Sequence, residues 1–171
     1  MWWLVSPQNP LKPAAGMASP EARLASAKAQ ARHPRIKPTL IEADLGTRFA
    51  VDTVAALKAR RPDVRFIWLM GADILPELHR WRQWRRFARS LPIAVLARPR
   101  YMGPALASPA MAWLRRWRHP RAGAARWTRW TLPAIILLDI RQTALSATAL
   151  RAADPDWDTR FGTPAAHKTA R

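Results

Sequence analysis

Cysteine is absent from the 171-residue sequence, so neither a disulfide nor a thiolate metal site can form. Long apolar runs are also lacking, because the stretch 134–138 is far shorter than the ~18 residues of a membrane-spanning helix. No basic segment followed by an apolar run marks a secretory signal. These absences are compatible with a reducing compartment, and we expect a cytoplasmic protein without a membrane partner.

Acidic residues are scarce, since 11 Asp and Glu stand against 29 Lys and Arg, and the formal net charge is +18. Such a balance favours anionic partners, including nucleotides and nucleic acid. Ten tryptophans are many for this length, and four of them alternate with arginine in 81–86 and 113–118, where they can stack on bases. Their spacing also matches the buried face of a helix, and a coding bias enriches Arg, Ala, Pro and Trp together. Packing is the commoner meaning, so nucleic acid is an unlikely partner.

Short apolar runs alternate with segments of helical periodicity along the whole chain. Repeated strand–helix alternation predicts an α/β fold with a doubly wound, mostly parallel sheet of about five strands. We expect one domain over 1–151 and an irregular tail over 152–171. Expected strands are 1–5, 36–41, 66–70, 91–97 and 132–138; expected helices are 19–31, 49–60, 75–90 and 109–118; 42–47 and 101–109 are expected loops, and 119–130 is expected to be irregular.

The segment 66–73 organises this pattern, because five apolar residues end in Gly-Ala-Asp. The run suits a strand buried on both faces. Ligands bind at the carboxyl ends of strands in such sheets, where Gly71 allows close backbone approach and Asp73 can accept hydrogen bonds. The alternative is a plain turn in which Asp73 caps a helix.

A second group of polar residues follows the last expected strand. Hydroxyls at Ser146 and Thr148, with Arg151, can open a helix that binds phosphate, or can simply cap it. Lys12, in a proline-rich loop, can reach a phosphate or be solvated. The four histidines are scattered, so no metal site is expected, and His79 is expected to be structural. Neither a phosphate-binding loop nor a Rossmann fingerprint occurs.

Four blocks, in order and in register over residues 2–151, resemble bacterial nicotinate-nucleotide adenylyltransferases. The match lies in 2–12, 46–53, 66–73 with the following 79–84, and 145–151. The resemblance implies a Rossmann-like nucleotidyltransferase fold. It also implies transfer of the adenylyl group of ATP to nicotinate mononucleotide, giving deamido-NAD and pyrophosphate with Mg²⁺, a late step of NAD synthesis.

The resemblance also implies which residues bind each substrate. The expected ATP-binding residues are Gly71, Asp73, Ser146, Thr148 and Arg151, and the expected nicotinate-nucleotide-binding residues are Lys12, Phe49, Ala50, Thr53 and Trp81. Trp81 would stack on the nicotinate ring, and backbone amides of 47–53 would receive its carboxylate.

The chain departs from the family pattern in two places. Phe49-Ala50 stands where Tyr-Thr is usual, which preserves a backbone contact but not a hydroxyl contact. The family's Gly-Gly-Ser-Phe-Asn-Pro-x-His-x-Gly-His loop does not occur. This loop would precede Met1, so we expect that the first strand is missing, either from a misplaced start codon or from a true truncation. We also expect impaired adenylyl transfer and marginal stability. The catalytic residues are therefore unassigned. The alternatives are a basic nucleic-acid-binding module and a related nucleotidyltransferase with another acceptor, such as pantetheine phosphate.

Overall fold

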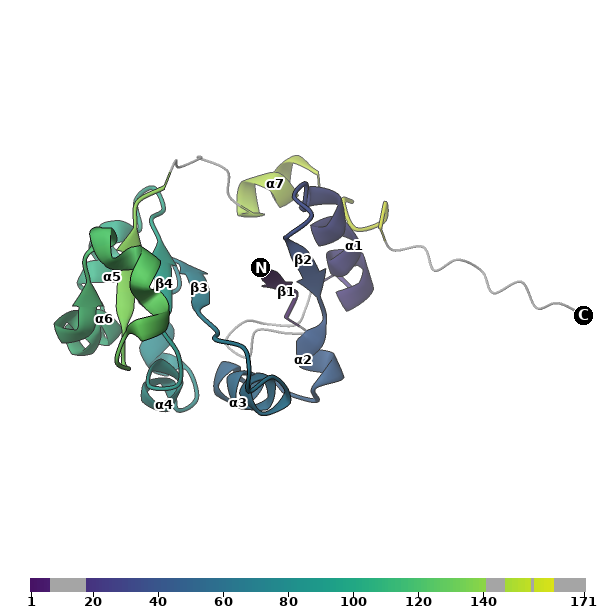
Figure 1. Ribbon diagram of the computed structural model, residues 1–171. Coiled ribbons are helices and arrows are strands. Elements are labelled where there is room, and N and C mark those ends of the chain that lie inside the picture. The colour runs from purple at the N-terminus through teal and green to yellow at the C-terminus, as the bar shows by residue number, and fades with distance from the viewer. Residues whose placement is uncertain (7–17, 141–146, 155, 162–171) are drawn as a thin grey trace, which may run out of the picture. The chain divides into compact units, whose positions relative to one another are not determined.

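The computed structural model describes residues 1–6, 18–140, 147–154 and 156–161. Contacts divide the chain into two compact units, one comprising 1–48 and 145–171 and the other 49–144. Figure 1 labels the helices and strands of both units. No helix in the described ranges has both the length and the apolar character needed to cross a membrane.

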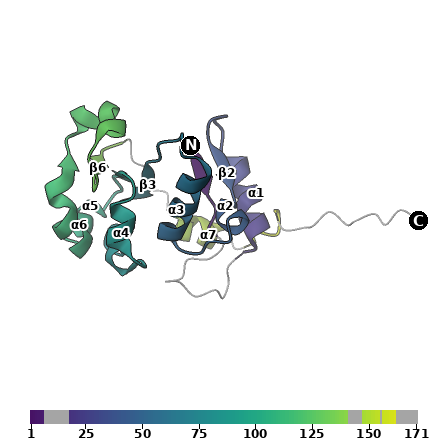
Figure 2. The same ribbon diagram turned by 60° about the horizontal axis from the view of Figure 1, so that its bottom comes forward.

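The first unit contains a two-stranded parallel sheet. Strand β1 (Trp2–Leu4) pairs with β2 (Lys37–Thr39), and helix α1 (Pro20–Gln30) runs alongside β2 in both ribbon views (Figures 1 and 2). Helix α1 begins where the sequence predicts, because the Ser19 hydroxyl accepts a hydrogen bond from the Ala22 amide. The unit also contains the short helices α2 (Ile41–Asp44) and α7 (Ala147–Ala153).

The second unit contains a four-stranded sheet in the order β3-β4-β6-β5, in which every neighbouring pair is parallel. The strands are β3 (Trp68–Gly71), β4 (Ile93–Leu96), β5 (Arg118–His119) and β6 (Ile135–Leu138). In register, Gly71 lies opposite Leu96, and Leu96 lies opposite Leu138. The carboxyl ends of β3, β4 and β6 therefore meet at one edge of the sheet. The predicted α/β fold with a parallel sheet is confirmed.

Helical segments connect these strands. The α-helices are α3 (Ala50–Arg60), α4 (Trp84–Ala88), α5 (Met102–Leu106) and α6 (Pro109–Leu114), and the 3₁₀ segments are η1 (Leu78–Arg80), η2 (Arg115–Trp117) and η3 (Arg121–Arg129). Helices α5 and α6 lie next to each other in both views, and α4 packs against α3 and η1 (Figures 1 and 2).

The core of the second unit lies between the sheet and these helices. Its largest fully buried side chains include Phe87, Leu78, Ile93, Leu114 and Ile135. Each such side chain contributes roughly 1.5–3 kcal/mol by leaving water. Strand β4 is buried at three of its four positions because it has a neighbour strand on each side. The strand that carries Gly71 is thus anchored beside the best-buried strand of the sheet.

The predicted continuous helix over 75–90 is wrong. Residues 72–83 form turns and the single 3₁₀ segment η1 before α4 begins. Three features break the helix: Pro76 has no amide to donate, Trp81 adopts an extended conformation, and Gln83 has a positive φ of 49°. The amphipathic spacing is real, but it is satisfied by a turn that folds back onto the core.

Several other local predictions are also wrong. Strand β3 is not buried on both faces, because it lies at the end of its sheet and Leu69 is 41% exposed. Residues within the predicted loops 42–47 and 101–109 form α2 and α5, and the irregular stretch 119–130 contains the end of β5 and η3. The tail is less irregular than predicted, since α7 reaches Ala153 and turns follow over 156–161.

Candidate functional site

An ion pair joins the carboxyl ends of β3 and β4. Gly71 and Leu96, the last residues of the two strands, lie opposite each other. Asp73 and Arg98, each two positions beyond its strand, therefore emerge side by side. The Arg98 Nη1 donates to Asp73 Oδ2 at 3.1 Å, with the arginine side chain 53% and the aspartate 26% exposed. The pair places a carboxylate and a guanidinium at the edge where parallel sheets bind ligands.

Gly71 leaves room for this carboxylate. A Cβ at position 71 would lie 2.2 Å from Asp73 Oδ1 and 3.1 Å from Arg98 Nε, so the two side chains would have to shift. The glycine therefore allows the present close approach of the carboxylate to the main chain. The structure thus brings together Gly71 and Asp73, as the sequence analysis expected.

The second oxygen of Asp73 is buried and has no hydrogen-bond partner among the described residues. The alternative interpretation of Asp73 as a helix cap is wrong, because turns follow it and η1 begins only at Leu78. A buried acceptor left without a donor costs roughly 1–3 kcal/mol. Such an oxygen can accept a hydrogen bond from a ligand hydroxyl or from water.

Trp81 lies in the turn before α4 and belongs to an aromatic cluster. Its ring meets Trp68 edge-on at 6.3 Å and is tilted against Phe87 at 5.7 Å, while Trp68 and Phe87 meet edge-on at 5.2 Å. Trp81 remains partly exposed, whereas Phe87 is buried. The cluster fixes the orientation of an indole ring that has part of its surface open to a ligand.

The start of α3 holds the remaining described residues that were expected to bind nicotinate. Phe49 caps the helix in an extended conformation, and its carbonyl accepts from the Thr53 hydroxyl at 3.2 Å. Thr53 is fully buried, so its hydroxyl serves the helix start. Ala50 is the first helical residue, and the first amides of a helix have no acceptor within it.

Two arginines, Arg82 near the start of α3 and Arg98 after β4, were not predicted as site residues by the sequence analysis. The Arg82 guanidinium lies over the Phe49 ring at 4.9 Å and its Nη1 approaches Asp52 Oδ2 at 3.5 Å. Arg98 follows β4 after one residue and could have been found by applying the carboxyl-end rule to that strand as well. Arg82 carries no such signal, because its position depends on the unpredicted turn before α4.

The rest of the predicted site belongs to the other unit. Lys12 and Ser146 lie outside the described residues, and for Thr148 and Arg151 only the backbone of α7 is described. That helix begins at Ala147, and the phosphate-binding role of these residues stays a prediction.

No group of three or more His, Asp or Glu side chains that could hold a metal occurs in the described parts of the chain. His79, in η1, has a buried Nδ1 without a partner among those same parts. The clear pKa shifts lie away from the site, at the exposed pair Arg61 and Asp63. Its bidentate hydrogen bond raises the pKa of Arg61 and lowers the pKa of Asp63.

Several curated proteins are similar to this chain over most of its length. A probable nicotinate-nucleotide adenylyltransferase of Erythrobacter litoralis is 55% identical over 161 residues, 94% of this chain and 74% of that protein. A protein described in the same words from Parvibaculum lavamentivorans is 51% identical over 151 residues, 88% of this chain and 75% of its own length. Another, from Gluconobacter oxydans, is 49% identical over 151 residues, 88% of this chain and 77% of its own length.

No protein-family model matches the chain. The solved structure of Plasmodium falciparum nicotinic acid mononucleotide adenylyltransferase complexed with APC matches 69% of this chain and 50% of that one, at 12% identity and a TM-score of 0.45.

Proposed function

The chain belongs to the nicotinate-nucleotide adenylyltransferase family, and we propose that it transfers the adenylyl group of ATP to nicotinate mononucleotide, giving deamido-NAD and pyrophosphate. The observation that carries this proposal is the 55% identity to such a protein over 94% of the chain. The proposal extends to a cytoplasmic reaction in NAD synthesis, as expected from the sequence. It also treats 1–151 as one functional domain.

In the proposed reaction, a phosphate oxygen of nicotinate mononucleotide attacks the α-phosphorus of ATP. The bond to the β-phosphate oxygen breaks, and pyrophosphate leaves with the electron pair. No protein nucleophile is needed, so the residues act by positioning the two substrates and by stabilising charge.

The pair at the ends of β3 and β4 suits the nucleotide side of this reaction. Asp73 accepts hydrogen bonds from nucleotide hydroxyl groups. Its Oδ1 is available for this, because that atom has no hydrogen-bond partner among the described residues. Gly71 lets the backbone approach the ligand, and Arg98 holds the carboxylate while its own exposed charge attracts phosphate. These roles are supported by the geometry of the pair and by the carboxyl-end rule.

The aromatic cluster and the start of α3 suit the nicotinate side. An indole face stabilises a pyridinium ring by cation–π attraction, and Trp81 is held in place for this by Trp68 and Phe87. The amide of Ala50, the first residue of α3, can receive the nicotinate carboxylate at the helix N-terminus, whereas the amides of Asp52 and Thr53 already donate to the Phe49 carbonyl. Phe49 and Thr53 act as positioning residues, since they fix the first turn.

We propose Lys12, Ser146, Thr148 and Arg151 as further phosphate-binding residues on the basis of the family resemblance. A bound Mg²⁺ would supply positive charge that stabilises the departing pyrophosphate. This ion typically uses one or two carboxylates together with substrate phosphates. Asp139, which directly follows β6, would supply one such carboxylate.

The test is product formation from ATP with alternative acceptors. The 171-residue chain and a form extended upstream by its genomic coding sequence are each assayed for pyrophosphate and for adenylylated product. Nicotinate mononucleotide, nicotinamide mononucleotide and pantetheine phosphate are compared as acceptors. We expect deamido-NAD from nicotinate mononucleotide as the dominant product. Preference for pantetheine phosphate, or no transfer to any acceptor by either form, would overturn the proposal.

A further inference from the structure

Two segments far apart in the sequence bring a row of three tryptophan rings together in the second unit. Trp84, on α4, meets Trp113, on α6, edge-on at a centroid distance of 5.1 Å. Trp113 in turn lies 4.6 Å from Trp117, in η2. All three rings are partly exposed, so they form a continuous aromatic strip at the surface.

Arginine side chains cover this strip. The Arg85 guanidinium lies 5.1 Å from the Trp84 ring and 5.9 Å from Trp113, and Arg89 lies 5.1 Å from Trp113. Arg116 lies 4.4 Å from the Trp117 ring. These distances are within the range of cation–π attraction. We call these six residues, Trp84, Arg85, Arg89, Trp113, Arg116 and Trp117, the Arg–Trp surface.

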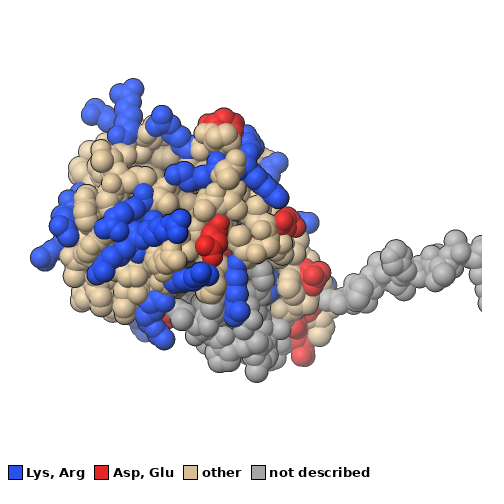
Figure 3. All heavy atoms as spheres, turned by 90° about the horizontal axis from the view of Figure 1, so that it is seen from below, with Lys and Arg blue, Asp and Glu red and all other residues tan. Residues whose placement is uncertain are grey.

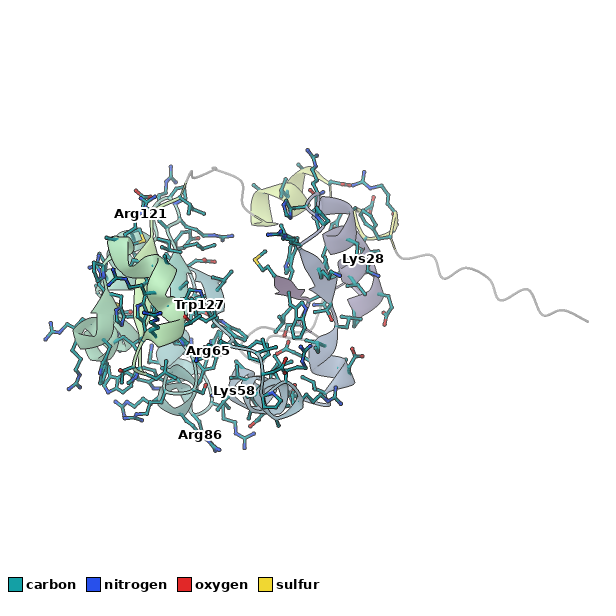
Figure 4. The ribbon with its side chains drawn as sticks, in the orientation of Figure 1. Lys28, Lys58, Arg65, Arg86, Arg121 and Trp127 are labelled. Atoms are coloured by element: carbon teal, nitrogen blue, oxygen red, sulfur yellow. The ribbon has the colours of Figure 1, made fainter. Side chains whose placement is uncertain are left out.

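The charge of the Arg–Trp surface is not balanced by acidic residues. No aspartate or glutamate occurs between residues 78 and 138. None of the ion pairs found among the described residues includes Arg85, Arg89 or Arg116. Arg86 of the same helix adds to the charge and extends away from the ribbon (Figure 4). Figure 3 shows more basic than acidic side chains in the view from below.

We propose that the Arg–Trp surface binds single-stranded nucleic acid without sequence preference. Guanidinium groups close to these indole rings can donate to phosphate oxygens, and unpaired bases can stack on the partly exposed rings and on the guanidinium planes. Helices α4 and α6 have five and six residues, so neither offers a recognition helix of the length that reads a duplex groove. The proposal is independent of adenylyl transfer.

An acidic membrane fits this surface less well. A membrane-binding face inserts well-exposed apolar side chains beside its basic ones. The three tryptophans of the Arg–Trp surface are only partly exposed, and the exposed large apolar residues among the described residues, such as Leu69, Tyr101 and Leu106, lie outside it. The sequence analysis assigned the tryptophans at helical spacing to packing. Because arginine side chains lie over their rings, these tryptophans also contribute to a charged surface.

The test is fluorescence anisotropy of a labelled oligouridylate of about 20 nucleotides, titrated with the protein at several salt concentrations. Each lost phosphate contact is expected to weaken binding about 5-fold near 100 mM salt, so Arg85→Gln/Arg89→Gln/Arg116→Gln should weaken it about 100-fold. The salt slope should fall by about 2. The matched control, Arg121→Gln/Arg126→Gln/Arg129→Gln in η3, removes the same charge and should retain most of the affinity.

Each arginine of the surface is also replaced singly, so that poor folding of the triple variant, monitored by circular dichroism, does not decide the outcome. Equal losses in the surface and control variants would reduce the effect to net charge and overturn the proposal. Undetectable binding by the unaltered chain would do the same. So would tighter binding to vesicles of acidic phospholipid, or to a duplex of equal length, than to the single strand.

Discussion

Replacing Gly71 by alanine tests the close approach at the end of β3. The added Cβ would lie 2.2 Å from Asp73 Oδ1, whereas an ordinary contact begins at 3.4 Å, so the carboxylate must move by about 1 Å. That movement competes with the 3.1 Å hydrogen bond to Arg98. Overpacking of this kind costs about 1–3 kcal/mol, and we expect a loss of that size in the free energy of unfolding.

The free energy of unfolding is measured by urea denaturation, and ATP affinity by calorimetry. The control is Gly123→Ala in η3, where the added Cβ would make only an ordinary contact with Pro120 Cγ at 4.0 Å, so stability should stay equal or rise. In an Asp73→Ala background the clashing oxygen is gone, and Gly71→Ala should then cost much less. An unchanged stability and ATP affinity for Gly71→Ala, or an equal cost in both backgrounds, would refute the reasoning.

Three further predictions concern other polar contacts. Arg98→Gln should change stability by less than about 1 kcal/mol, because the pair with Asp73 is partly exposed, but should weaken ATP binding measured by calorimetry. The pKa of the Asp63 carboxyl, measured by NMR, should lie below its ordinary value and return toward it in Arg61→Gln. The small stabilisation of the folded state by this pair is present above the unfolded pKa of about 4 and is lost as the pH falls through the lower folded pKa. Ser108→Ala should cost about 1–2 kcal/mol in urea unfolding, because this buried hydroxyl caps α6 by accepting from a backbone amide and also donates to a carbonyl.

The fold could be predicted from the sequence where local signals and burial agree. The strand signal at 91–97 succeeded because β4 has a neighbour on each side and its apolar run is buried. The cap at Ser19 succeeded because its interactions are local. The helix expected over 75–90 failed because its periodic apolar residues are buried by a turn with a positive φ at Gln83, which no spacing rule reveals.

The candidate site was predictable to the extent that it depends on one strand end. Gly71 and Asp73 could be singled out because they are adjacent in sequence to an apolar run. Their pairing with Arg98 depends on the register of β3 against β4, which the sequence does not encode locally. The contact between Arg82 and Phe49 crosses from the turn before α4 to the start of α3, so it required the tertiary structure.

The parallel pairing of all strands in the second unit has a consequence for the order in which the sheet assembles. No pair can close through a hairpin. Strands β5 and β6 pair across the chain from Arg118 to Ile135, and β4 and β6 pair across the longer chain from Ile93 to Ile135. The longer closure costs only about 0.8 kcal/mol more in chain entropy. Strand β3 pairs with all four residues of β4 across a chain from Trp68 to Ile93, which is shorter than the chain between β4 and β6, whereas β5 contributes only two residues. The pairing of β3 with β4 is therefore expected to nucleate the sheet, with slow refolding typical of non-local contacts.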